Sequence, residues 1–169
     1  MLSPFLRKLL LADQVSFTEG EIKILQKNFY MQPIFNMITF QHDMKKLSKF
    51  LYRNGKKTSR ELVAHFNKLG ISSKQQLLNI WFDFINMFGI AQLEIVNMDE
   101  KTRKVNIRAK KSSFAKEYSL RYGKQKESVD YILAGAIAGF FSKYFNKSVD
   151  CKETNCTAKG EMYCQFAVR

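Results

Sequence analysis

The sequence predicts a single α/β domain of the α+β type, preceded by a short N-terminal arm. Its 169 residues match the usual size of one domain. Hydrophobic residues make up 46% and charged residues 25% of the chain, which is typical of a folded protein rather than a disordered one. Apolar residues recur at helical spacing in the first half of the chain and then alternate with a period of two.

The N-terminal residues are expected to form the arm. Residues 15–25 predict a short hairpin that turns at Glu19-Gly20. An arm with exposed apolar residues needs cover, so we expect residues 1–33 to take part in dimerisation. Residues 34–169 would then form the domain.

Three successive helices are predicted after Pro33. Asn54-Gly55, Gly70 and Gly89 are expected to end them, because glycine is the commonest residue just beyond a helix C-terminus. Hydroxyl side chains stand where the second and third helices would begin, and such residues are favoured N-caps.

The period-two pattern predicts an antiparallel hairpin, which is followed by helices and then strands. The expected elements are strands at 90–98 and 104–109, helices at 113–122 and 127–145, and strands at 148–154 and 162–168. Gly135 and Gly139 lie four residues apart in the longer helix, so we expect another element to pack closely against them.

The charge is the most unusual feature of the composition. Lys and Arg number 28 and Asp and Glu 15, a net charge of +13, which favours an acidic protein, an anionic membrane surface or nucleic acid as partner. The excess lies mainly in segments 45–60 and 101–126. The predicted surface for an anionic partner consists of Lys45, Lys46, Lys49, Arg53, Arg103, Lys104, Arg108, Lys110 and Lys111.

No helix-turn-helix or RNA-recognition signature accompanies this charge, so any nucleic-acid binding would be non-specific. Alternation in the hairpin places Lys104, Asn106 and Arg108 on one strand face. Such a face could lie along phosphates.

The three cysteines, Cys151, Cys156 and Cys164, lie close together in the sequence. Their odd number and clustering argue against a disulfide framework and favour a metal or a reducing compartment. No apolar run approaches the ~18 residues of a membrane span, and the N-terminus lacks the order of a signal peptide. We therefore expect a cytoplasmic protein.

Two thiols eight residues apart, with Gly160 between them and Glu153 just before, could hold zinc, which accepts such mixed ligands. The alternative is that the cysteines pack as small buried hydrophobic residues.

The C-terminal pattern Glu153-x-x-Cys156-x-Ala158-x-Gly160-x-x-x-Cys164-x-Phe166 resembles the ending of the 4-vinyl reductase domain family. Further matches are Leu51-Tyr52-x-x-Gly55-x-x-x-Ser59-Arg60-Glu61-Leu62 and Ser113-x-Ala115, so that the resemblance extends over about residues 36–169. It implies a fold similar to TRAPP-type vesicle-tethering subunits, with helices covering an antiparallel sheet, and a homodimer.

The same resemblance implies a zinc site. Phenol- and xylene-sensing members of the family bind zinc through Cys, Glu, Cys and Cys. Glu153, Cys156 and Cys164 correspond to the last three of these ligands, and Asp130 stands near the position of the first. Cys151 shares a strand face with Glu153 and could substitute for that ligand.

Aromatic residues at helical spacing suggest an apolar-ligand pocket. The candidates are Trp81, Phe84, Phe88, Tyr118 and Tyr131, although such stripes also occur in ordinary cores. Sensor members of the family hold an aromatic effector, and tethering members hold an acyl chain.

No catalytic motif is present. The chain lacks a G-x-G-x-x-G fingerprint, and neither His42 nor His65 has an evident catalytic neighbour in sequence. We therefore expect a non-enzymatic domain that binds a small apolar or aromatic ligand, has a regulatory role and carries a structural zinc. One alternative is an assembly protein akin to a tethering subunit, which binds a protein partner or anionic lipid. The other is a nucleic-acid-associated regulator.

Overall fold

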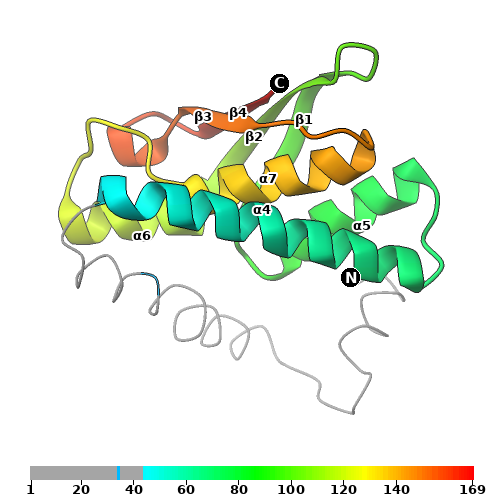
Figure 1. Ribbon diagram of the computed structural model, residues 1–169. Helices are drawn as coiled ribbons and strands as arrows, with labels where there is room; N and C mark the ends of the chain where they lie inside the picture. The colour runs from blue at the N-terminus through cyan, green and yellow to red at the C-terminus, as the bar shows by residue number, and fades with distance from the viewer. Residues whose placement is uncertain (1–33, 35–43) are drawn as a thin grey trace.

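A four-stranded antiparallel sheet, with helices packed on one of its faces, makes up the part of the chain that the computed structural model describes (Figure 1). That part is residue 34 and residues 44–169. The predicted α+β fold, with helices covering an antiparallel sheet, is therefore confirmed. The arm predicted at 1–33 lies outside the described residues.

The strands are β1 (Ala91–Asp99), β2 (Lys104–Ser112), β3 (Cys151–Asn155) and β4 (Cys164–Val168), and their order in the sheet is β1-β2-β4-β3. The period-two pattern gives the sheet one apolar and one polar face. Val105 and Ile107 are buried on the helix side of β2, and Ile107 pairs with the buried Phe166 of β4. The intervening residues of β2 face away from the helices, as predicted.

The helices are α4 (Met44–Lys68), α5 (Lys74–Met87), α6 (Ser113–Tyr122) and α7 (Tyr131–Tyr144). Helix α7 lies between α4 and the sheet (Figure 1). Side chains of Ser73, Ser112 and Asp130 accept backbone hydrogen bonds at the starts of α5, α6 and α7. None of these four helices combines the length and the hydropathy that a bilayer span requires.

The predicted helix end at Asn54-Gly55 is wrong, because α4 continues through these residues to Lys68. The second helix, predicted to begin at the hydroxyl residues Thr58 and Ser59, is therefore the second half of α4. Gly55 instead allows a close helix crossing. A Cβ on Gly55 would lie 3.0 Å from the Ala136 backbone nitrogen of α7, and one on Gly135 would lie 2.8 Å from the Tyr52 carbonyl carbon of α4. The close neighbour predicted for Gly135 and Gly139 is therefore α4.

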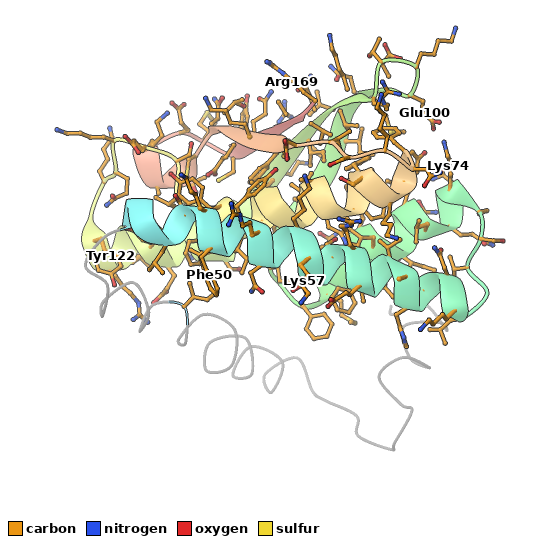
Figure 2. All side chains as sticks on the ribbon, viewed as in Figure 1. Phe50, Lys57, Lys74, Glu100, Tyr122 and Arg169 are labelled. Carbon is orange, nitrogen blue, oxygen red and sulfur yellow. The ribbon has the colours of Figure 1, made fainter. Side chains whose placement is uncertain are left out.

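The turn between β1 and β2 is tied to two helices through Glu100, at one end of the molecule (Figure 2). Lys74 Nζ, at the start of α5, donates a hydrogen bond to Glu100 Oε2 at 3.0 Å. The Tyr144 hydroxyl, at the end of α7, donates one to Glu100 Oε1 at 2.8 Å. Both carboxylate oxygens are therefore engaged in fixing the hairpin over the helices.

Helix α4 is also tied to the edge strand β3. The Tyr52 hydroxyl accepts a hydrogen bond from the Cys151 backbone N–H at 3.0 Å and donates one to Asp150 Oδ1 at 3.0 Å. One turn later, Lys56 Nζ donates to the Val149 carbonyl at 2.7 Å and to Asp150 at 2.6 Å. These bonds hold the start of β3 against α4.

Candidate metal centre and apolar cavity

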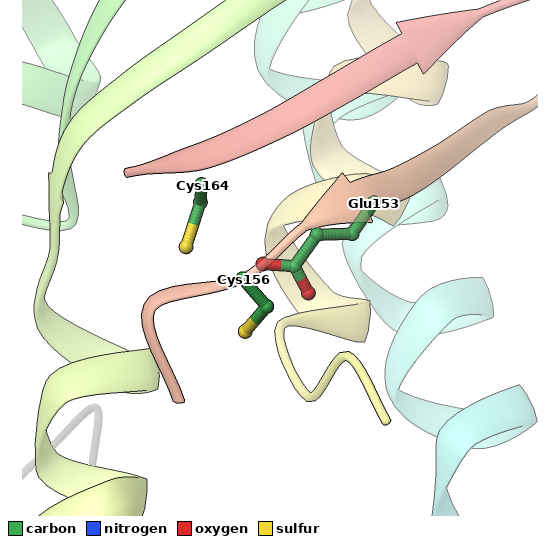
Figure 3. Close-up of side chains that lie close together, drawn as sticks. All are labelled: Glu153, Cys156 and Cys164. Carbon is green, nitrogen blue, oxygen red and sulfur yellow. The ribbon is translucent and has the colours of Figure 1, made fainter. Parts of the chain in front are cut away.

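Glu153, Cys156 and Cys164 form a buried group at the end of the β3–β4 strand pair, and their side chains converge (Figure 3). One ligand atom from each lies within 4.8 Å of the others. The antiparallel register explains this convergence. Asn155 pairs with Gln165, so the next residue of each chain segment, Cys156 and Cys164, faces the other. The structure thus brings together three of the predicted metal ligands.

The Glu153 carboxylate has one oxygen in use and one available. Oε2 accepts a hydrogen bond from the Asp130 backbone N–H at 2.9 Å. Oε1 is buried and has no hydrogen-bond partner in the described part of the chain. Burial, followed by the charge of Cys156, raises the pKa of Glu153 to about 8. A buried polar atom without a partner is unusual in folded proteins, and a cation beside Oε1 would satisfy it.

A hydrogen bond links the two thiols next to this carboxyl group and shifts their pKa values in opposite directions. A hydrogen bond from Cys164, together with backbone donors at Val129 and Ala158, lowers the pKa of Cys156 to about 6. The same hydrogen bond and burial raise the pKa of Cys164. Without a metal, one thiol therefore stabilises the other as a thiolate. Two sulfurs and one carboxylate oxygen are typical zinc ligands, so the residues present fit that metal, with one coordination position left over.

Asp130 and Cys151, the other two predicted ligands, lie outside this three-residue group. Both oxygens of Asp130 are engaged, Oδ1 by the Leu133 N–H at 3.2 Å and Oδ2 by the Ser112 hydroxyl at 2.6 Å. Burial, followed by the charge of Glu153, raises the pKa of Asp130 to about 7. Asp130 therefore caps α7 and orients Glu153. A ligand role for Asp130 or Cys151 stays a prediction.

A second feature is an apolar cavity of about 340 Å³ between α4, α5 and α7. Trp81 and Phe84 of α5, two of the predicted ligand-binding residues, line it together with Ile132 of α7. Trp81 is fully buried, and its indole Nε1 donates a hydrogen bond to the Ser59 hydroxyl at 2.9 Å. The volume lies at the lower end of the range for small-molecule sites.

The cavity does not include the other three predicted aromatic residues. Phe88 follows α5 and packs on Phe84, with ring centroids 4.5 Å apart. Tyr118 is buried in α6, where it packs on Tyr122 at 4.8 Å. Tyr131 lies beside β3 and lines a separate groove of about 810 Å³.

Sequence reasoning missed the polar residues that α4 contributes to the cavity, namely Asn54, Thr58 and Ser59. The helix end expected at Gly55 concealed the continuous face to which they belong. The signal that could have found them is the helical spacing of Leu51, Ser59 and Leu62, which continues across Gly55.

The structure divides the predicted anionic-partner surface between two places. Lys49 and Arg53 are exposed on α4, in the helical layer. The remaining described members belong to the β1–β2 hairpin: Arg103, Lys104, Arg108, Lys110 and Lys111. The side chains of Lys45 and Lys46 lie outside what the structure describes.

Two of the hairpin cations are paired with the same acid. Glu94 binds Arg108 at 3.1 Å and Lys110 at 2.6 Å. Arg108 also lies 4.5 Å from the ring centroid of Tyr163. The sheet face is therefore partly neutralised.

Comparisons with known proteins agree with this fold. Residues 112–169, which contain the three-residue group, match the model of the 4-vinyl reductase domain family. No curated protein matches the chain.

Solved structures extend the likeness to the rest of the chain. The phenol-responsive sensory domain of the transcription activator PoxR, solved with phenol, is 13% identical over 99% of this chain and 90% of that chain, with a TM-score of 0.63. Trafficking protein particle complex subunit 3 from Naegleria fowleri, covalently bound to palmitic acid, is 18% identical over 90% of this chain and 96% of that one, with a TM-score of 0.64.

A vinyl-4-reductase family protein from Methanocaldococcus jannaschii is 15% identical over 96% of this chain and 87% of that chain, with a TM-score of 0.55. At such identities, likeness to a solved structure establishes the fold and leaves function open. The resemblance to the 4-vinyl reductase domain family is thus confirmed, in sequence over residues 112–169 and in structure through the fold.

Proposed function

We propose that this domain binds a small apolar or aromatic molecule in the cavity between α4, α5 and α7 and acts as a sensor, with a structural zinc at the end of the β3–β4 strand pair. The observation that carries the proposal is the cavity itself. It has apolar walls and a few polar groups on one side, the usual composition of a small-molecule site.

The size and lining of the cavity narrow the ligand class. A volume of about 340 Å³ is the space of roughly eleven water molecules at ~30 Å³ each, which suits a substituted ring or a medium-length chain. Asn54, Thr58 and Ser59 offer hydrogen bonds to one polar group of the ligand. The Trp81 indole N–H donates a hydrogen bond to Ser59, so it has a partner even when the cavity holds no ligand.

The structural neighbours support this choice, since one was solved with phenol and another with palmitic acid. In this chain the ligand would be held without a covalent bond. All three cysteines lie in residues 151–164, and none of them lines the cavity.

Zinc would be held by Glu153, Cys156 and Cys164. When bound, it neutralises the buried acidic group and cross-links the end of β3 to the start of β4. Glu153 also bonds the backbone at Asp130, where α7 begins. The next turn of α7 supplies Ile132 and Leu133 to the cavity wall. The metal therefore has a supporting role, and we assign no reaction to it.

Trp81 provides the test, because it is the only tryptophan of the chain and lines the cavity. Purified protein is titrated with phenol, dodecanoate and hexadecanoate while tryptophan fluorescence is recorded. We expect a saturable change with at least one of these probes. The change should disappear in Ala136→Leu, which fills the cavity, and persist in Ala64→Leu, the same substitution at a partly exposed position of α4 outside the cavity.

Two results would overturn the proposal. One is the absence of a saturable change with all three probes. The other is an equal response in wild type and Ala136→Leu, which would place the ligand elsewhere.

A further inference from the structure

A basic groove of about 430 Å³ lies between α4 and the C-terminal end of α7. Five cations and one acid line it: Arg53, Lys56, Lys57, Arg60 and Lys143, with Glu61. The groove lies on the opposite flank of α4 from the apolar cavity, whose α4 lining includes Asn54 and Thr58. The two sites are therefore separate, and neither the proposed ligand nor the proposed zinc uses this groove.

Only part of the positive charge in the groove is balanced. Lys56 is committed to Asp150, at 2.6 Å, and only 19% of its side chain is exposed. Lys57 and Glu61 are 3.8 Å apart, with 76% and 67% of their side chains exposed, so they form a loose, solvated pair. Arg53, Arg60 and Lys143 make no ion pair within residues 44–169.

This arrangement is unfavourable for the helix alone. Arg53 and Lys57, and likewise Lys56 and Arg60, are like charges four residues apart, a spacing that destabilises a helix. No acidic residue lies between Lys45 and Arg60 to relieve the repulsion. An exposed helix face without a ligand normally mixes both signs of charge.

We propose that the basic groove binds a ligand that carries two or more neighbouring phosphate groups. Arginine guanidinium groups form paired hydrogen bonds with phosphate oxygens, and lysine adds a compact positive charge. Arg53 and Arg60 come from one wall and Lys143 from the other, so a compact polyanion can reach all three. Of the residues predicted to form the anionic-partner surface, Arg53 lines this groove, and the other cations of the groove are not part of that prediction.

Soluble polyphosphates and lipid headgroups share this chemistry, and two measurements distinguish them. In the first, the full chain is titrated calorimetrically with tripolyphosphate at low and at physiological salt. In the second, it is sedimented with vesicles that contain phosphatidylinositol bisphosphate. Vesicles of equal charge made with phosphatidylserine are the reference.

Two triple variants with the same net charge distinguish binding in the groove from general attraction to a positively charged protein. The groove variant is Arg53→Gln/Arg60→Gln/Lys143→Gln. The control is Lys104→Gln/Lys111→Gln/Lys116→Gln, at exposed positions of β2 and α6. Both must keep the circular dichroism spectrum and the Trp81 fluorescence of wild type.

We expect the groove variant to bind at least tenfold more weakly, in whichever measurement wild type binds, and the control to change less than twofold. Equal weakening in both variants would overturn the proposal, because it would indicate attraction by net charge alone. No binding in either measurement would also overturn it, and so would equal binding to the two kinds of vesicle without any binding of tripolyphosphate.

Discussion

The contact between α4 and α7 predicts the effect of a single methyl group at Gly135. A Cβ there would lie 2.8 Å from the Tyr52 carbonyl carbon and 3.0 Å from the Lys56 nitrogen. Ordinary carbon contacts are ~3.5–4.0 Å, so the helices would have to separate by roughly 1 Å. The obstacle is backbone and cannot rotate away.

Gly135→Ala should therefore cost as much as a severe overpacking mutation, ~3 kcal/mol of unfolding free energy. For a chain of this size, each kcal/mol lowers the melting temperature by ~2–4 °C, so the expected decrease is ~6–12 °C. Thermal unfolding followed by circular dichroism measures it. Asn67→Ala, at an exposed position of α4, is the control and should change the melting temperature little.

A Gly135→Ala protein as stable as wild type would refute this reasoning. It would mean that the two backbones are not in contact and that Gly55 does not serve as a packing residue.

Three further predictions concern the metal site and the cavity. Metal analysis of protein purified under reducing conditions should find close to one zinc per chain in wild type and in the control Cys151→Ser. It should find less than half a zinc per chain in Cys164→Ser. Equal zinc contents in the two variants would contradict the site. Burial raises the pKa of Glu153 to about 8, so zinc must displace a proton there below that pH. Its affinity, measured with a competing chelator, should rise about tenfold per pH unit for each proton released between pH ~6 and ~8, and a pH-independent affinity would contradict the Glu153 ligand. Ser59→Ala leaves the Trp81 N–H buried without a partner and should cost ~1–3 kcal/mol in chemical denaturation, whereas an unchanged midpoint would indicate that the indole reaches water.

Local signals in the sequence are sufficient for much of the fold. Ser73 caps α5 where a hydroxyl residue predicts a helix start, because a cap depends on residues three positions away. The same signal at Thr58 and Ser59 is misleading, since both residues lie inside α4. The β1–β2 hairpin is predictable because apolar and polar residues alternate on both sides of a single turn. The Gly55 prediction is wrong because a glycine serves equally well at a helix end and at a close crossing, and the deciding partner, the α7 backbone at Ile132 and Ala136, is far away in sequence.

The candidate metal site is also predictable from residues that lie close together in the sequence. The lining of the cavity is predictable only in part. Glu153, Cys156 and Cys164 converge because a short turn joins two paired strands. Asp130 cannot be placed from sequence, since its role depends on Ser112, a distant residue. The placement of Tyr131 likewise depends on how the helices pack on the sheet.

The central claim is that the cavity between the helices holds the ligand, and nuclear Overhauser effects from a bound probe test it most directly. With phenol or dodecanoate bound, we predict contacts from probe protons to the Trp81 indole and the Ile132 methyl groups, since both residues line the cavity. Contacts to Tyr131 without any to Trp81 would place the ligand in the groove beside β3 and contradict the account.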